Sequence, residues 1–323
     1  MKWSTCALLV MGSCLASACS SPVPRTQRPA SAAGLETSVR VGVSEAGRIV
    51  VRVVPLELYV QAASLSEFAP ASENAGTAQR MLEVQAVIGR TYAISHLGRH
   101  ARDGYDLCDR THCQLFQPGR LTTSRWAAQA AAASRDTRAQ VLWFNGAPAL
   151  AVFHADCGGR TSAAADVWGG TLHPYLLSRS DNDGAAGDAH APWQYGISRP
   201  ALQAALNSDR RTHVGKRLDG IHVVERDGAG RAIRVRLDGA NPRVVRGVDL
   251  REVLAGAFGA RSLRSTWFDV RQERGRIVFD GRGFGHGVGL CQAGALARIR
   301  AGASLDAVLQ RYFPDTKLVK TNG

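Results

Sequence analysis

The chain has 323 residues, of which 45% are hydrophobic, and this is enough to bury a full core in one large domain or in two closely joined ones. The formal net charge is +13 at pH 7, and the isoelectric point is about 10.0. Because the arginines are scattered along the chain, this charge indicates a basic surface and no nucleic-acid partner.

Residues 1–19 have the pattern of a lipoprotein signal peptide. A positive start is followed by the apolar run 7–11 and then by small residues up to Cys19. This pattern predicts that Cys19 is lipidated and attaches the chain to a membrane, with Cys14 as a weaker candidate. The alternative is an ordinary signal peptide that is cleaved after Ala18. The apolar run is far shorter than the ~20 residues of a membrane-spanning helix.

Residues 20–37 are rich in Pro, Ser, Ala and Arg, which is typical of a flexible tether. A lipid anchor and a tether predict an exported protein of the cell envelope, a periplasm-facing outer-membrane lipoprotein. A basic protein fits the anionic surfaces of that compartment. The compartment is also oxidising, so the four cysteines beyond the signal peptide are candidates for disulfides or metal ligands.

Beyond the tether, antiparallel hairpins alternate with helices. Turn residues separate predicted strands at 39–43 and 48–54, 141–144 and 149–154, 221–225 and 232–237, and 265–272 and 276–280. Apolar spacing predicts helices over 55–66, 77–97, 248–258, 292–301 and 305–312. This mixture predicts an α+β fold for residues 38–320, with 195–260 as a candidate inserted lobe and 181–192 as a mobile surface loop.

Residues 281–295 form a glycine-rich loop with one histidine, His286, and they lead directly into a predicted helix. Glycine is favoured where the backbone takes positive φ or approaches another group closely. A loop of this density gains no packing, so we expect it to present backbone N–H groups and one side chain to a polar ligand. The alternating glycines do not match the G-x-G-x-x-G spacing, and there is no Walker lysine, which excludes a nucleotide loop.

Two predicted helices carry polar groups in apolar surroundings. Glu67 lies at the end of the first helix beside Phe68. A carboxyl group against apolar neighbours has a raised pKa and can donate a proton near neutral pH, although a solvated carboxylate is the alternative. Gln85 lies among apolar residues of the second helix and therefore needs a hydrogen-bond partner.

From about Val39 to Lys317 the chain resembles the sporulation stage II protein D family, also called the SpoIID/LytB domain. The stretch 70–77 is longer than is usual in that family. The resemblance lies in several separate motifs that occur in the family's order: Leu56-Glu57-Leu58-Tyr59-Val60, Glu67, Glu83-Val84-Gln85-Ala86-Val87, Arg90-Thr91-Tyr92-Ala93, His154-Ala155-Asp156-Cys157-Gly158-Gly159, Val167-Trp168-Gly169, 281–295 and 309–316.

The resemblance implies a peptidoglycan lytic transglycosylase. Such an enzyme cuts between N-acetylmuramic acid and N-acetylglucosamine, prefers strands without stem peptides, and leaves a 1,6-anhydro sugar. The family's catalytic glutamate falls on Glu67, which would act as acid and then as base. We expect the substrate-binding residues to be Gln85, Arg90, Tyr92, His154, Gly285, His286, Gly287 and Gln292. The alternative is a non-catalytic peptidoglycan-binding protein that enhances a cell-wall amidase.

His100, Cys108, His112 and Cys113 form a second constellation. Two thiolates and two imidazoles are a normal set for tetrahedral zinc, and some members of the family hold a zinc in this loop. The distance in sequence between His100 and Cys108 leaves His96 as a substitute ligand. With four protein ligands the zinc would be structural, whereas a metallohydrolase would need an open position. The alternative is a Cys108–Cys113 disulfide.

Cys157 and Cys291 lie in motifs that the family brings to one cleft. The resemblance therefore implies a Cys157–Cys291 disulfide, and the alternative is a pair of small buried thiols.

Overall fold

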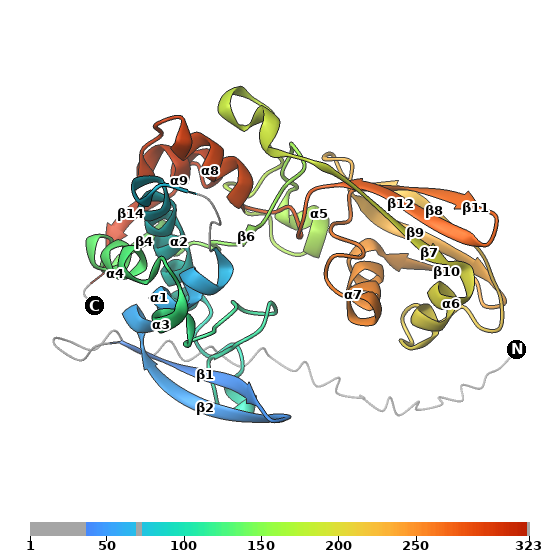
Figure 1. Ribbon diagram of the computed structural model, residues 1–323, viewed down its shortest axis with the longest axis horizontal. Helices are drawn as coiled ribbons and strands as arrows, with labels where there is room; N and C mark the ends of the chain where they lie inside the picture. The colour runs from blue at the N-terminus through green and yellow to red at the C-terminus, as the bar shows by residue number, and fades with distance from the viewer. Residues whose placement is uncertain (1–36, 69–72, 322–323) are drawn as a thin grey trace, which may run out of the picture. The chain divides into compact units, whose positions relative to one another are not determined.

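The computed structural model describes residues 37–68 and 73–321 (Figure 1). The predicted signal peptide 1–19, the lipidation site Cys19 and all of the tether except Thr37 lie outside the described residues. Within the described ranges, helices and small, mainly antiparallel sheets confirm the predicted α+β fold. Among the helices in these ranges, none combines the length and the apolar character needed to cross a membrane.

The helices match the predicted ones closely at both ends of the chain. They are α1 (Leu56–Glu67), α2 (Ala75–Ser95), α3 (Arg120–Thr123), α4 (Ala127–Asp136), α5 (Ala164–Trp168), α6 (Arg199–Asn207), α7 (Gly247–Phe258), α8 (Gln292–Arg300) and α9 (Leu305–Tyr312), with short 3-10 turns at Ala101–Asp103 and Gly184–Ala189.

The strands are short and are grouped into several small sheets. They are β1 (Ser38–Glu45), β2 (Arg48–Pro55), β3 (Leu107–Cys108), β4 (Gln140–Phe144), β5 (Ala147–Pro148), β6 (Phe153–His154), β7 (Pro192–Ser198), β8 (Leu218–Arg226), β9 (Ala232–Gly239), β10 (Arg243–Arg246), β11 (Phe268–Glu273), β12 (Arg276–Arg282), β13 (Leu290–Cys291) and β14 (Lys317–Lys320).

Three helices form the frame that carries Glu67. α1 packs against α2 and α4 through a buried cluster that includes Leu65, Leu82 and Ala130 (Figure 1). The side chain of Asn74 accepts a hydrogen bond of 2.9 Å from the Thr77 N–H and so caps the start of α2. A further core links α2 to α8, α9 and β4. The end of α1 is therefore held by packing on several sides.

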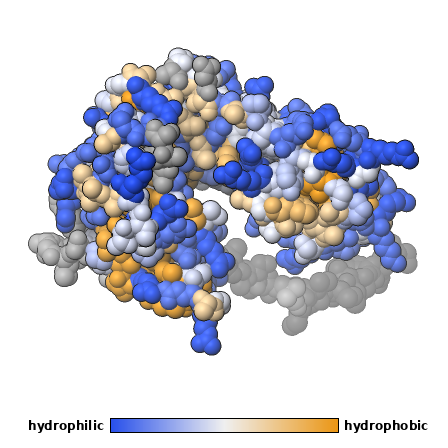
Figure 2. All heavy atoms as spheres, viewed as in Figure 1, coloured by the Kyte–Doolittle hydropathy of each residue, from blue (hydrophilic) through white to orange (hydrophobic). Residues whose placement is uncertain are grey.

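The predicted β1–β2 hairpin is present, and its turn lies at Ala46 and Gly47, which both have positive φ. One face of β1 is buried through Val39 and Val41. The outer strand β2, in contrast, exposes apolar side chains, and Val53 is 70% exposed. Figure 2 shows this hydrophobic surface on the hairpin. The short β3 pairs with β1 in parallel and brings Cys108 beside it.

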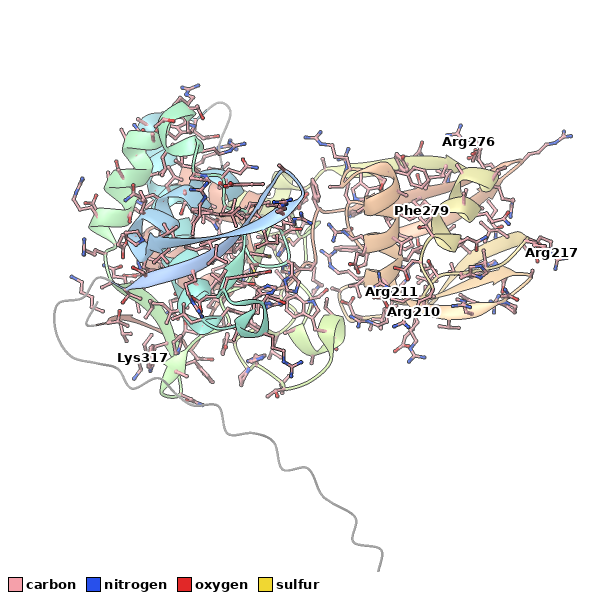
Figure 3. All side chains as sticks on the ribbon, turned by 90° about the horizontal axis from the view of Figure 1, so that it is seen from below. Arg210, Arg211, Arg217, Arg276, Phe279 and Lys317 are labelled. Atoms are coloured by element: carbon pink, nitrogen blue, oxygen red, sulfur yellow. The ribbon has the colours of Figure 1, made fainter. Side chains whose placement is uncertain are left out.

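Residues 193–279 have a hydrophobic core of their own. It lies among two three-stranded sheets, β10-β9-β8 and β11-β12-β7, and the helices α6 and α7. Figure 3 shows Phe279 in this core and Arg217 and Arg276 at its outside. The described residues nevertheless belong to one compact unit, and the predicted lobe at 195–260 is part of this larger region.

The segment 181–192 differs from the predicted mobile surface loop. Asp181 is 1% exposed, and the side chain of His190 is 4% exposed. Asp181 is buried because Tyr312 and Arg298 bind its carboxylate, with distances of 3.0 and 2.9 Å. Both ends of the segment are therefore attached to the body of the protein.

Candidate active site

Glu67 is the last residue of α1. Its Oε1 accepts a hydrogen bond of 2.6 Å from the backbone N–H of Leu115. Burial raises the pKa of Glu67 to about 7, and the Leu115 hydrogen bond opposes this rise. Near neutral pH the carboxyl group is therefore divided between its protonated and ionised forms, which is the state that an acid–base catalyst needs.

Gln85 and Gln292 lie beside Glu67. The side-chain amide of Gln292 donates to Gln85 Oε1 at 3.1 Å and to the backbone carbonyl of Glu67 at 3.4 Å. The partner that buried Gln85 requires is thus Gln292, at the start of α8. Burial raises the pKa of Tyr92, and negative charge on Glu67 adds a smaller rise. Two predicted binding residues, Gln85 and Gln292, therefore lie at Glu67, and Tyr92 is within range of its charge.

Arg90 has a different environment from these three. Its side chain is fully buried, and it binds Glu57 through two hydrogen bonds of 2.8 and 2.6 Å. It also donates to the backbone carbonyl of Gln140 at 3.1 Å. This bidentate pair joins α1 to α2, so Arg90 has a structural role. Its expected contact with substrate stays a prediction that this geometry does not favour.

The remaining predicted binding residues surround His286. The ring centroids of His154 and Trp168 lie 5.4 and 5.0 Å from that of His286. Burial lowers the pKa of His286 to about 3, and positive charge on Arg251 adds to this effect, so the ring is neutral. Its Nδ1 accepts a hydrogen bond from the Val288 N–H. Trp168 is 42% exposed and forms the outer member of this group.

The glycine loop is closely packed, contrary to the expectation that its glycines gain no packing. A Cβ atom at Gly285 would lie 2.7 Å from His154 Cβ, and one at Gly287 would lie 2.3 Å from Arg231 Nε. The amides of Phe284 and Gly285 are bonded to carbonyl oxygens inside the protein. The loop therefore uses its glycines for close approach, and only part of its backbone is left for a ligand.

The first metal cluster consists of His100, Cys108, His112 and Cys113, whose candidate ligand atoms all lie within 4.8 Å of one another. Cys113 Sγ is 3.4 Å from His100 Nε2 and 3.8 Å from His112 Nδ1. Both cysteines are free, so the alternative disulfide is not formed in this structure. These donors suit tetrahedral zinc. His96 instead stacks on Tyr92 and is not part of the cluster.

The first metal cluster lies directly before the residues that contact Glu67. Gln114 accepts a hydrogen bond of 3.0 Å from the buried Tyr59 hydroxyl, and Leu115 donates its amide to Glu67. A metal held by Cys113 would therefore fix the peptide whose amide opposes the rise in the pKa of Glu67. Leu115 could not be identified from the sequence, because its contribution comes from the backbone and carries no side-chain signal.

Cys157 and Cys291 lie together as expected, but the predicted disulfide is not formed, and both are free and fully buried. Their sulfur atoms instead make hydrogen bonds. Cys291 Sγ accepts from the Cys157 N–H at 3.2 Å, and Cys157 Sγ lies 3.3 Å from Asp181 Oδ2. The pairing of β6 with β13 places Cys291 opposite His154 and so brings the two thiols together.

Two surface hollows in the described part of the chain lie away from Glu67. One is lined by residues of β7, β11 and β12, including Trp193 and Trp267. The other includes Trp168, Arg231 and Arg234, and it lies beside the His286 group. The second hollow therefore has an exposed aromatic side chain, the indole of Trp168, next to predicted binding residues.

Comparison with known proteins supports the resemblance. The model of the Stage II sporulation protein family (SpoIID) matches residues 44–144, and that of a Domain of unknown function (DUF8618) matches residues 184–289. The amidase enhancer of Bacillus subtilis is 25% identical over 280 residues, which are 73% of this chain and 37% of that protein. The chain therefore spans little more than a third of that relative.

Two further relatives are covered more fully. Stage II sporulation protein D of Bacillus subtilis is 26% identical over 278 residues, which are 82% of this chain and 74% of that protein. An uncharacterized protein of Brachyspira hyodysenteriae is 26% identical over 275 residues, or 85% and 69% of the two chains. Residues 44–144 thus match the Stage II sporulation protein family model, and Glu67, Gln85 and the first metal cluster all lie within this range.

Proposed function

We propose that this protein has a cell-wall role as a peptidoglycan lytic transglycosylase, with Glu67 as its single acid–base group. The observation that carries the proposal is the buried carboxyl group of Glu67, whose pKa is raised to about 7 while the Leu115 amide orients one of its oxygens. The similarity to the sporulation family supports the cell-wall role.

The reaction needs one carboxyl group. Protonated Glu67 gives its proton to the glycosidic oxygen, and the bond from that oxygen to C1 of N-acetylmuramic acid breaks. The C6 hydroxyl of the same sugar then bonds to C1, and the Glu67 carboxylate takes the hydroxyl proton. Hydrolytic glycosidases use a second carboxylate. The pKa of Glu67 is shifted by burial and by the Leu115 amide. No second carboxylate among the described residues contributes to this shift.

The residues around Glu67 divide between positioning and binding. Gln292 and Gln85 hold the backbone at Glu67 through an amide chain. The exposed ring of Trp168, next to His286, offers a surface for a sugar ring. A zinc in the first metal cluster would be structural, since four protein ligands leave no open position.

The test is mass spectrometry of purified glycan strands, intact and stripped of stem peptides, after incubation with the protein. We expect 1,6-anhydro products from the wild type, more of them from stripped strands, and none from Glu67→Gln. The matched control is Glu225→Gln, which alters a carboxyl group that is 54% exposed and far along the chain. Products with a reducing end would instead show hydrolysis and would require a second base.

A second candidate function rests on the similarity to the amidase enhancer. In this case the protein would bind peptidoglycan and increase the activity of a cell-wall amidase without cutting glycan itself. Retained glycan binding without cleavage, together with stimulation of an amidase that survives Glu67→Gln, would favour this candidate. Loss of stimulation in Glu67→Gln would count against it.

We further propose that the chain reaches the envelope as an outer-membrane lipoprotein attached through Cys19. The check is the mass of the N-terminal peptide of protein recovered from membranes. A diacylglyceryl-modified Cys19 supports the proposal, and a peptide that begins unmodified after Ala18 refutes it.

A further inference from the structure

A second cluster of metal-ligating side chains lies outside the proposed catalytic site. Cys157 follows β6, Cys291 ends β13, and His190 precedes β7. Both thiols are fully buried, and the His190 side chain is 4% exposed. With Asp156, these residues place their candidate ligand atoms within 4.8 Å of one another.

The distances in this cluster match a tetrahedral site. His190 Nε2 lies 3.8 Å from Cys157 Sγ and 3.8 Å from Asp181 Oδ2, and the last two atoms are 3.3 Å apart. Zinc bonds of ~2.0–2.3 Å at tetrahedral angles place neighbouring ligand atoms about 3.3–3.8 Å apart. The spacing of these three atoms is therefore compatible with one shared ion, and Cys291 Sγ belongs to the same group of candidate ligand atoms as Cys157 and His190.

The other nitrogen of His190 has the partner that a metal-bound imidazole needs. His190 Nδ1 is 2.5 Å from Asp156 Oδ1. A carboxylate at this position fixes the ring of a metal-bound imidazole. His190 Nε2 faces the Asp181 carbonyl oxygen at 3.1 Å as well as Cys157 Sγ, so metal binding would exchange that hydrogen bond for a metal bond. Asp156 is itself held, because its Oδ1 accepts a hydrogen bond of 2.8 Å from the Gly158 N–H.

Backbone amides point at both sulfur atoms. The amides of Cys157, Gly159 and Gly294 donate to them at 3.2–3.4 Å, and such bonds stabilise the charged form. The contact with Cys291 and burial nevertheless raise the pKa of Cys157, so a bound dication would displace its thiol proton.

Arg231 is 1% exposed, donates to the Cys157 carbonyl oxygen and lies over the Trp267 ring at 5.8 Å, but its Nε and Nη1 have no hydrogen-bond partner. Negative charge on Asp227 acts on this buried cation, and negative charge at the cluster would add to it.

The thiolate forms of the two cysteines would place negative charge beside the carboxylates of Asp156 and Asp181, and a dication would offset it. Arg298 is shared between Asp181 and Asp183, at 2.9 and 2.6 Å, so its charge is not available to the cluster alone.

We propose that Cys157, Cys291, His190 and Asp181 bind a second, structural Zn²⁺ ion, with Asp156 as the residue that positions His190. The ion joins the β6 end, the 181–190 segment and the start of α8. Its ligand Cys291 is directly followed by Gln292, which bonds to Glu67. Binding releases the two thiol protons and any His190 proton to solvent, and the protein is not oxidised.

The first test is the metal content of the full chain, purified without chelators and measured by elemental mass spectrometry. The variant with Cys157→Ser and Cys291→Ser should hold one zinc ion fewer per chain than the wild type, whether or not the first metal cluster is filled. An unchanged zinc content would overturn the proposal. So would a Cys157–Cys291 cross-linked peptide in a non-reducing digest of fresh protein.

A milder variant covers the case in which the serine variant does not fold. Asp156→Asn should weaken zinc binding at this site about 10–100-fold, as measured by competition with a chromophoric chelator. Asp269→Asn, at a carboxyl group that is 82% exposed, should leave the competition curve unchanged. Identical curves for Asp156→Asn and the wild type, with folding intact by circular dichroism, would refute the assignment.

Discussion

The raised pKa of Glu67 predicts a pH-dependent difference in stability between the wild type and Glu67→Gln. Below about pH 4.5 the carboxyl group is protonated in both the folded and the unfolded chain. As the pH rises, the unfolded chain ionises first, and the native state loses stability until the pH passes the folded pKa of about 7. Glutamine does not ionise, so the variant keeps the stability that the wild type loses.

The magnitude follows from the rise in pKa from 4.5 to about 7. At about 1.36 kcal/mol per pKa unit, this rise corresponds to roughly 3 kcal/mol of unfolding free energy. The assay is urea unfolding of both proteins near pH 4 and again well above neutrality. The advantage of the variant should grow by roughly this amount between the two conditions, whereas Glu225→Gln should show little change. A growth below about 1 kcal/mol would show that Glu67 titrates as an exposed carboxyl group.

The same titration predicts that glycan cleavage declines as the pH rises above about 7. Removal of metal from the first metal cluster should move this decline to higher pH if it loosens the Leu115 segment, because a weaker Leu115 hydrogen bond lowers the pKa of Glu67 less. Readdition of zinc should reverse the shift. Glu57→Gln should destabilise the protein by about 3–5 kcal/mol in urea unfolding, since it leaves the Arg90 charge buried and unpaired; a change below about 1 kcal/mol would refute the structural role. Gly287→Ala should lower the melting temperature through its clash with Arg231, whereas Gly256→Ala, in open space on α7, should be neutral or stabilising by ~0.5–1 kcal/mol. Trp168→Ala should weaken binding of stripped glycan by ~0.5–1.5 kcal/mol in a pull-down titration without changing the melting temperature; equal binding would remove Trp168 from the sugar path.

Local signals predicted most of the secondary structure. The Asn145-Gly146 turn has positive φ at both residues, and α1, α2 and α7–α9 start and end within about two residues of the predicted helices. The parallel pairs were not predicted. β3 and β6 are two residues long, and their partners β1 and β13 are distant in sequence, so no periodicity marks them. They form because tertiary packing brings their segments together.

The site was predictable to the extent that side chains carry chemical character. Glu67, Gln85 and the His/Cys pattern of the first metal cluster could be identified from residue type and order. The amide of Leu115 could not be identified from the sequence, because it belongs to the backbone. The burial of Asp181 and His190 could not be predicted either, because it depends on tertiary contacts. Asp181, for example, binds Tyr312, which is more than a hundred residues away in the chain. The Cys157–Cys291 pair was placed correctly, but its chemistry depends on the neighbouring His190.

The contact between Glu67 and Gln292 spans 225 residues of sequence. Closing a loop of this length costs chain entropy before the contact is gained, so contacts of such long range are slow to form. The amide chain that fixes Glu67 is therefore complete only after α8 has docked, close to the end of the polypeptide. A chain that is still being synthesised or is only partly folded already contains Glu67, but it lacks the Gln292 contact that holds the Glu67 backbone. We therefore expect catalytic activity only after the last helices have folded onto the rest of the protein.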